Sequence, residues 1–231
     1  MSCSVDRFKV AGRQFPFGGR CSLFENARKR RPLAEEAPDL VEQRAESIFG
    51  GPTAAARGDH ASAAPASIGI PRALTTHSLF PLYSTFFSEL GWDVVLSGVD
   101  PRGGLKSHSG FCLPAQIAHG AMLDLGRRGV GHVFLPHVVR MPREGPCRDS
   151  YLCPITQGGP YYLAKAFPDA RCLTPVLDFT HGYEASSVLE AMAVGELGAP
   201  RERAARAWAA AVRAQIDAER RLRDLGERAL A

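Results

Sequence analysis

Two cysteines, Cys112 and Cys153, stand where a thiol can be activated. Each lies just ahead of a proline that opens a predicted helix, in the segments FCLPAQ and LCPITQ. Each of these helices follows a predicted parallel strand. The positive end of a helix macrodipole lowers the pKa of a thiol and favours a metal or an anion beside it. The two segments therefore predict one site that both thiols share.

An alternation of strand and helix patterns positions these thiols. Short apolar runs predict the strands, and apolar residues at helical spacing predict the helices between them. This alternation predicts an α/β fold, a Rossmann-like and mostly parallel doubly wound sheet. The predicted strands are 67–71, 92–97, 130–135 and 172–177, and the predicted helices are 78–90, 113–129 and 160–167.

Ligands of such a sheet bind beyond the carboxyl ends of its strands. Cys112 and Cys153 both fall at this edge, whereas Cys172 opens a strand and is predicted to be a core thiol at the opposite edge. Cys147 lies six residues before Cys153 and is either a further ligand or a bystander. Four more residues are candidates for supporting the site or contacting a substrate: Arg72, Ser97, His119 and His137.

Thiolates at helix N-termini suit an iron–sulfur cluster or zinc, because both bind deprotonated sulfur. The chain contains no Cys-x-x-Cys pair, which argues against a zinc ribbon or a ferredoxin run. The remaining possibility for a metal site is a set of ligands that are far apart in the sequence and are held together by an α/β scaffold. The alternative is that both cysteines are small buried apolar residues, as free cysteines often are.

The chain divides into four stretches by composition. Residues 1–24 form a small hairpin-like segment that carries Cys3 and Cys21, and residues 25–66 form a flexible linker in which only 39–49 predicts a short helix. Residues 67–199 form the α/β domain. Residues 200–231 form a long amphipathic helix, whose apolar stripe is expected to pack on this domain, on a partner or on a missing domain.

Composition excludes several functions. The chain has 231 residues and is 45% hydrophobic, enough for one domain-sized core. No apolar run reaches the roughly 18–20 residues that span a bilayer, and the polar N-terminus predicts a cytoplasmic location. Glycine-rich nucleotide loops and a Gly-x-Ser-x-Gly elbow are lacking. The first 31 residues are basic, but without a recognition motif nucleic acid is not an expected partner.

Several motifs, in this order, resemble a domain of the CoA-substrate-specific enzyme activases, the activases of 2-hydroxyacyl-CoA dehydratases. They are IGIPRAL at 68–74, PLYSTFFSELG at 81–91, VVLS at 94–97, CLPAQ at 112–116 and CPI at 153–155. The stretch from DRF at 6–8 to GGRC at 18–21 is similar to the cysteine-bearing segment that joins this domain to an ATPase in the long members. The resemblance implies that the chain is one piece of such a protein, without its ATPase and without a second dehydratase-like half.

The resemblance also implies a function. Related domains accept a low-potential electron on an iron–sulfur cluster from an ATPase of the actin/Hsp70-like fold. Carried over to this chain, Cys112 and Cys153 are two ligands of a [4Fe-4S]-type cluster with an incomplete ligand set, and Cys3 and Cys21 belong to the joining segment. Expected partners are the ATPase, a second dehydratase-like domain and an acyl-CoA. The alternatives are a cluster-free module that docks on the ATPase and an incomplete dehydratase subunit, and neither is expected to be catalytic alone.

Overall fold

The computed structural model describes residues 6–10, 12–17, 39–50, 66–98, 100–103, 112–143 and 145–230. The chain forms two compact units, Met1–Asp39 and Leu40–Ala231. Cys3 and Cys21 lie outside the described residues, so their predicted role stays a prediction. None of the described helices combines the length and the apolar character needed to cross a membrane.

The first unit contains the predicted hairpin. Strands β1 (Asp6–Val10) and β2 (Arg13–Phe17) pair antiparallel, and Val10 lies opposite Arg13. The turn between them is therefore two residues long, and Gly12 within it has a φ of 77°. Two-residue hairpin turns need positive φ angles, which glycine adopts without steric cost.

The second unit is built on a parallel sheet in the order β4-β3-β5-β7, which confirms the predicted α/β fold. The chain runs from the central strand β3 outward to β4 and then crosses back to β5 on the other side of β3. The carboxyl ends of β3 and β5 are thus a topological switch point, the usual ligand site of such sheets. The strands are β3 (Ser67–Ile70), β4 (Asp93–Leu96), β5 (His132–Phe134) and β7 (Arg171–Leu173).

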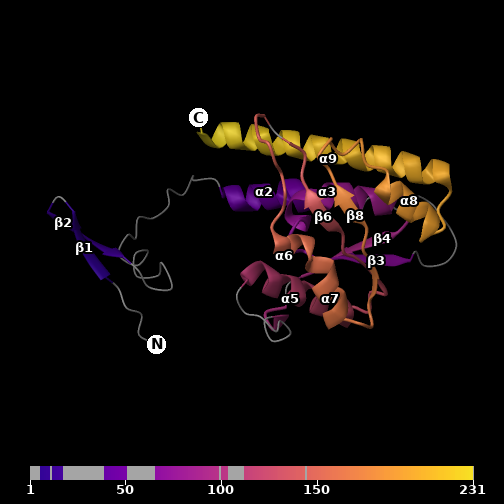
Figure 1. Ribbon diagram of the computed structural model, residues 1–231, viewed down its shortest axis with the longest axis horizontal. Coiled ribbons are helices and arrows are strands. Elements are labelled where there is room, and N and C mark those ends of the chain that lie inside the picture. The colour runs from indigo at the N-terminus through magenta and orange to yellow at the C-terminus, as the bar shows by residue number, and fades with distance from the viewer. Residues whose placement is uncertain are drawn as a thin grey trace. The chain divides into compact units, whose positions relative to one another are not determined.

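Helices cover both faces of this sheet (Figure 1). One face carries the larger apolar cluster, which includes Phe86, Phe134 and Trp208, and the other face carries a smaller cluster around Met122 and Leu163. The sheet is therefore doubly wound, as predicted. The first group of helices is α3 (Thr76–Glu89), α8 (Val188–Gly195) and α9 (Arg201–Leu230), and the second is α5 (Leu113–Arg127) and α7 (Gly159–Ala166).

A second, two-stranded parallel sheet was not predicted. It pairs β6 (His137–Arg140) with β8 (Val176–Asp178), directly after β5 and β7. The prediction of one strand over 172–177 is therefore wrong. Pro136 and Pro175 interrupt both strands, because proline has no N–H to donate to the ladder. The two strand pairs stay side by side, since Leu135 and His137 donate backbone N–H groups to Leu173 and Pro175, each at 2.8 Å.

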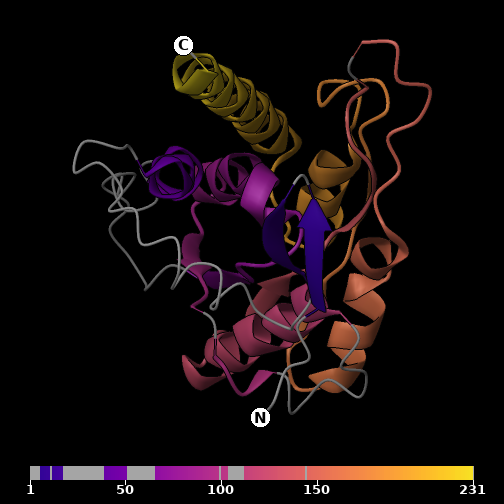
Figure 2. The same ribbon diagram turned by 90° about the vertical axis from the view of Figure 1, so that its left-hand side faces the viewer.

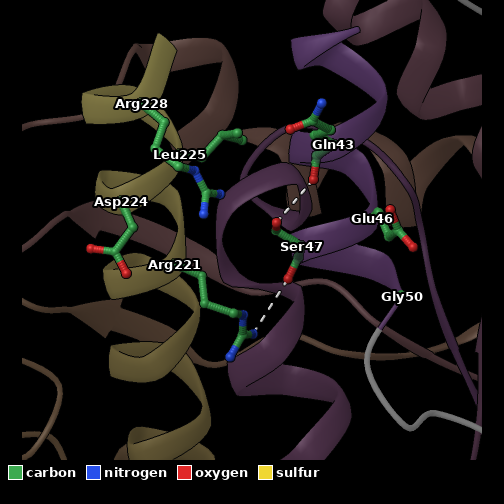
Figure 3. Close-up of a pocket in the computed structure, with 8 residues that line it drawn as sticks. All are labelled: Gln43, Glu46, Ser47, Gly50, Arg221, Asp224, Leu225 and Arg228. Atoms are coloured by element: carbon green, nitrogen blue, oxygen red, sulfur yellow. Dashed lines mark hydrogen bonds between the residues drawn. The ribbon is translucent and has the colours of Figure 1, made fainter. Parts of the chain in front are cut away.

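Helix α2 (Leu40–Phe49) packs against α3 and α9 and belongs to the second unit. The sequence-based division instead placed it within the linker 25–66. Ile48 is only 2% exposed, and the Phe49 ring lies 5.3 Å from that of Phe80, so α2 adds its apolar face to the larger cluster. On the outer side, α2 and α9 border an open groove of about 560 Å³, across which Arg221 donates to the Ser47 carbonyl at 3.5 Å (Figure 3).

The apolar stripe of α9 packs on this chain itself. Trp208 and Val212 are buried in the larger cluster, and Ile216 and Leu222 pack against it. Gln215, also on α9, donates to the Ser78 carbonyl of α3 at 3.0 Å. The sequence left open whether the apolar stripe of α9 packs on this domain, on a partner or on a missing domain. In the structure it packs on this domain. The stripe is therefore not a free surface for a missing neighbour.

The loop after β4 approaches the backbone of α5 closely. Asp100 donates its N–H to the Gly120 carbonyl at 3.2 Å. A Cβ on Gly120 would stand 2.3 Å from the Asp100 carbonyl oxygen, and a Cβ on Gly103 would stand 2.2 Å from the Gly120 nitrogen. Bonds from Arg102, and then the charge of Arg127, hold the pKa of the Asp100 carboxyl well below its usual range. Two glycines and this ion network thus fix α5, and with it Cys112 at its N-terminus.

Candidate functional site

A small pocket lies at the switch point between β3 and β5. Its walls come from the loop after β3, the end of β5, α5 and the segment after Cys153, all on one edge of the sheet. The pocket is small, with a free volume of about 30 Å³, which is enough to hold ordered water. Most of the lining is apolar: Pro71, Ala73, Leu74, Thr75, Thr76, Ala118, Phe134, Leu135, Pro136, Thr156, Gly159, Pro160 and Leu163.

Leu74 on the wall of this pocket has a strained backbone. Its φ is 51°, and it is the only non-glycine residue with a positive φ in the described part of the chain. A branched side chain adopts this conformation at a cost of roughly 1–3 kcal/mol. Such strain collects at ligand sites, and Leu74 also reaches Gly159 on the opposite wall, where a Cβ would stand 3.2 Å from its Cδ1. The strained backbone of Leu74 and the topology of the sheet therefore both indicate this pocket as the candidate ligand site.

Cys153 caps a short helix, α6 (Pro154–Gln157), which leads through Gly158 into α7. Its Sγ accepts a hydrogen bond from the Thr156 N–H at 3.4 Å, and the Thr156 hydroxyl lies 3.2 Å away. These two bonds lower the pKa of the Cys153 thiol, the hydroxyl more than the N–H. Because Thr156 also lines the pocket, it connects the thiolate with the switch point.

Replacing Thr156 by valine is expected to raise the pKa of the Cys153 thiol. The substitution removes the hydroxyl and leaves the backbone N–H, so the thiolate loses its stronger donor. Alkylation of Cys153, followed by mass spectrometry as the pH is varied, should then require a higher pH for half-maximal rate. Cys147 in the same sample is the internal control, and an unchanged profile at Cys153 would show that the hydroxyl does not stabilise the thiolate.

Cys112 is the N-cap of α5 and is half-buried, with no hydrogen bond from its side chain to the helix. Tyr162 of α7 lies near both Cys112 and Cys153. The pKa of Tyr162 is raised to about 12, first by burial and then by the negative charges of both thiolates. The Tyr162 hydroxyl donates to the Ile155 carbonyl at 3.2 Å. Both predicted thiols therefore lie near Tyr162, at one edge of the sheet.

Cys147 does not join this pair. It lies in the loop between Arg140 and Tyr151, whose ends are closed by an antiparallel bridge and by the bond from Met141 N–H to the Ser150 carbonyl. The loop rises away from the sheet and the helices (Figure 2). Among the described residues, no three His, Cys, Asp or Glu side chains come together to hold a metal ion. The described residues thus offer two thiolates of the predicted site.

Arg72 and Ser97 are joined by a bond that ties the ends of β3 and β4 together. The Arg72 N–H donates to the Ser97 hydroxyl at 2.8 Å, and the Ser97 side chain is buried. The role of Ser97 seen here is therefore structural. The Arg72 guanidinium is directed elsewhere, because its central carbon lies 4.3 Å from the centre of the Phe49 ring.

The two candidate histidines are packed side chains. His119 is buried, stacks on Tyr162 with 5.7 Å between ring centres, and has Nδ1 2.8 Å from the Ala115 carbonyl. His137 is the first residue of β6. Its Nδ1 lies 2.8 Å from the Gln157 carbonyl, and its ring meets that of Tyr161 at 4.4 Å. Both histidines thus support the segment around α6 and α7.

Cys172 behaves as the sequence analysis expects of a core thiol. It lies in β7, packs against the smaller apolar cluster, and has its pKa raised by burial. Sequence reasoning missed Thr156, although it stands three residues after the capping Cys153, which is a capping spacing. It also missed the strain at Leu74, for which the sequence carries no signal.

No curated protein and no solved structure matches the chain. A protein family described as the CoA enzyme activase uncharacterised domain matches residues 67–231, which cover the sheet, both thiols and α9. The resemblance inferred from the motifs is therefore confirmed, and the chain belongs to the family of the CoA enzyme activase uncharacterised domain.

Proposed function

We propose that this domain carries an iron–sulfur cluster, with Cys112 and Cys153 as two of its ligands, and accepts an electron from an ATPase partner. The observation that supports this most is that Cys112 and Cys153 are the N-cap residues of α5 and α6, two helices that begin at the carboxyl edge of the sheet. A cluster of this kind would store and pass one electron at low potential. In this proposal the remaining ligands come from outside the described residues.

The residues of the chain prepare the two thiols for such a role. The Thr156 hydroxyl and N–H stabilise the Cys153 thiolate, which is the form that binds iron. Cys112 stands at the amino end of the 15-residue helix α5, where the macrodipole favours negative charge. The stacked rings of His119 on α5 and Tyr162 on α7 hold these two helices together.

Iron and sulfide analysis after anaerobic purification tests the proposal. The wild-type chain, produced with its ATPase partner, is expected to contain iron and sulfide. The Cys112→Ser/Cys153→Ser double variant should lose nearly all of both, because serine is a poor ligand for these clusters. Cys172→Ser is the matched control and should keep its iron, since Cys172 is a core thiol. A double variant with wild-type iron content would refute the assignment.

A second candidate function is a cluster-free module that docks on the ATPase. Leu113 and Tyr161 favour it, because they are 66% and 75% exposed and lie in α5 and α7, beside the two cysteines. An iron-free wild-type protein that still binds the ATPase would establish this function instead. The third interpretation, a dehydratase subunit that binds an acyl-CoA, stays a prediction, and acyl-CoA binding measured with the partner domains present tests it.

A further inference from the structure

Three basic side chains gather where α2 touches the start of α3: Arg72 and His77 contact the ring of Phe49, and Arg44 bonds to the backbone of His77. The Arg72 guanidinium carbon lies 4.3 Å from the centre of this ring, and the His77 ring meets it edge-on at 5.5 Å between centres. Arg44 of α2 donates to the His77 carbonyl at 2.9 Å. Three separate parts of the chain thus contribute to one basic cluster: α2, the loop after β3 and the first turn of α3.

The positive charge of this basic cluster is not neutralised within the described part of the chain. Neither Arg44 nor Arg72 forms an ion pair with a carboxylate there. The pKa of His77 is lowered, first by burial and then by the charges of Arg72 and Arg44. The amino end of the 14-residue helix α3 adds to the positive potential. Like charges gathered without a counter-charge leave a place for an anion.

The basic cluster borders the switch-point pocket. Pro71 and Ala73, on either side of Arg72, line that pocket, and so does Thr76, next to His77. Arg44 is exposed, and Arg72 and His77 are half-buried, so solvent reaches all three. A small molecule bound at the carboxyl ends of β3 and β5 would therefore meet the basic cluster at the edge of its site.

We propose that Arg44, Arg72 and His77 bind the phosphate group of a small-molecule ligand. Two guanidinium groups present planar forks of donors that match phosphate oxygens, and a protonated His77 imidazole would add a third positive charge. Arg44 lies outside residues 67–231, so the part of the chain that matches the family does not form this site alone. The phosphate site goes beyond the proposed electron-transfer function and does not depend on a cluster.

Calorimetric titration of the full chain with inorganic pyrophosphate at low ionic strength tests the site. The variants Arg44→Gln and Arg72→Gln are each expected to bind roughly 10- to 100-fold more weakly, as loss of charged hydrogen bonds predicts. Arg213→Gln is the matched control, because Arg213 is an exposed arginine on α9. It should bind as the wild type does. Circular dichroism of each variant verifies that its helices are intact.

Two results would overturn the site: no pyrophosphate binding by the wild type, or equal weakening in Arg213→Gln and Arg44→Gln. Titrations with coenzyme A and with ADP separate the two sources of phosphate, since the tighter of them identifies the ligand class. In NMR, bound pyrophosphate should raise the pKa of His77 and leave that of His132 unchanged, because His132 lies in β5 beside Arg171. None of these measurements involves iron, so a failure here is distinct from a failure of the cluster assignment.

Discussion

Replacing Phe134 by alanine is expected to lower the free energy of unfolding by about 3–5 kcal/mol. Phe134 is 1% exposed at the end of β5, and its ring contacts those of Tyr83 and Phe87, each at 4.9 Å between centres. Alanine would leave a cavity that α3 cannot fill without moving. Urea denaturation followed by circular dichroism measures the loss as a lower midpoint with an unchanged slope.

Leu230→Ala is the control for this prediction. Leu230 is 92% exposed at the end of α9, so its truncation should change the free energy of unfolding by less than about 0.5 kcal/mol. Phe134 also lines the switch-point pocket, so its removal should enlarge that pocket. A Phe134→Ala variant with wild-type stability would mean that β5 does not pack on α3 as described.

Two glycines of α5 are expected to respond to alanine with opposite signs. A Cβ at Gly120 would stand 2.3 Å from the Asp100 carbonyl oxygen, a backbone atom that cannot turn aside. Gly120→Ala should therefore destabilise the protein by about 1–3 kcal/mol, since the loop after β4 has to move away. Thermal denaturation of the full chain measures this change.

Gly126 is the matched site, six residues further along the same helix. Nothing lies within 4 Å of a Cβ at Gly126, so Gly126→Ala should stabilise the protein by about 0.5–1 kcal/mol through helix propensity alone. The pair separates close packing from the general preference of helices for alanine. If both variants were stabilised, the close approach of the Asp100 loop to α5 would be wrong.

The elements that sequence patterns predicted are those with a simple periodicity. Helices α3 and α5 carry apolar residues at helical spacing, and β3 and β4 are short apolar runs. The second sheet was missed because Pro136 reads as the end of a strand. In the structure, the proline interrupts only the hydrogen-bond ladder, and the chain pairs again from His137 to Val176.

The sequence predicted where the two thiols of the candidate site lie, but it did not predict which side chains surround them. Helix capping placed Cys112 and Cys153 at one edge, since a proline near a helix start is a local signal. The position of Cys147 depends on the path of the loop from Arg140 to Tyr151, which no local pattern specifies. The packing of Tyr162 against His119 joins α7 to α5, and such contacts between distant segments leave no trace in the spacing of residues.

Helix α2 lies between two possible starting points of this domain. The family match begins after it, at residue 67, whereas the compact unit begins with it, at Leu40. The part of the chain that matches the family, residues 67–231, leaves out Ile48 and Phe49, whereas the compact unit Leu40–Ala231 includes them. A chain trimmed to residues 67–231 would expose the apolar surface around Phe80 that these side chains cover. Such a trimmed protein would be prone to self-association. Work on single domains of this family should therefore choose the domain boundaries from packing, and keep helix α2, which precedes β3.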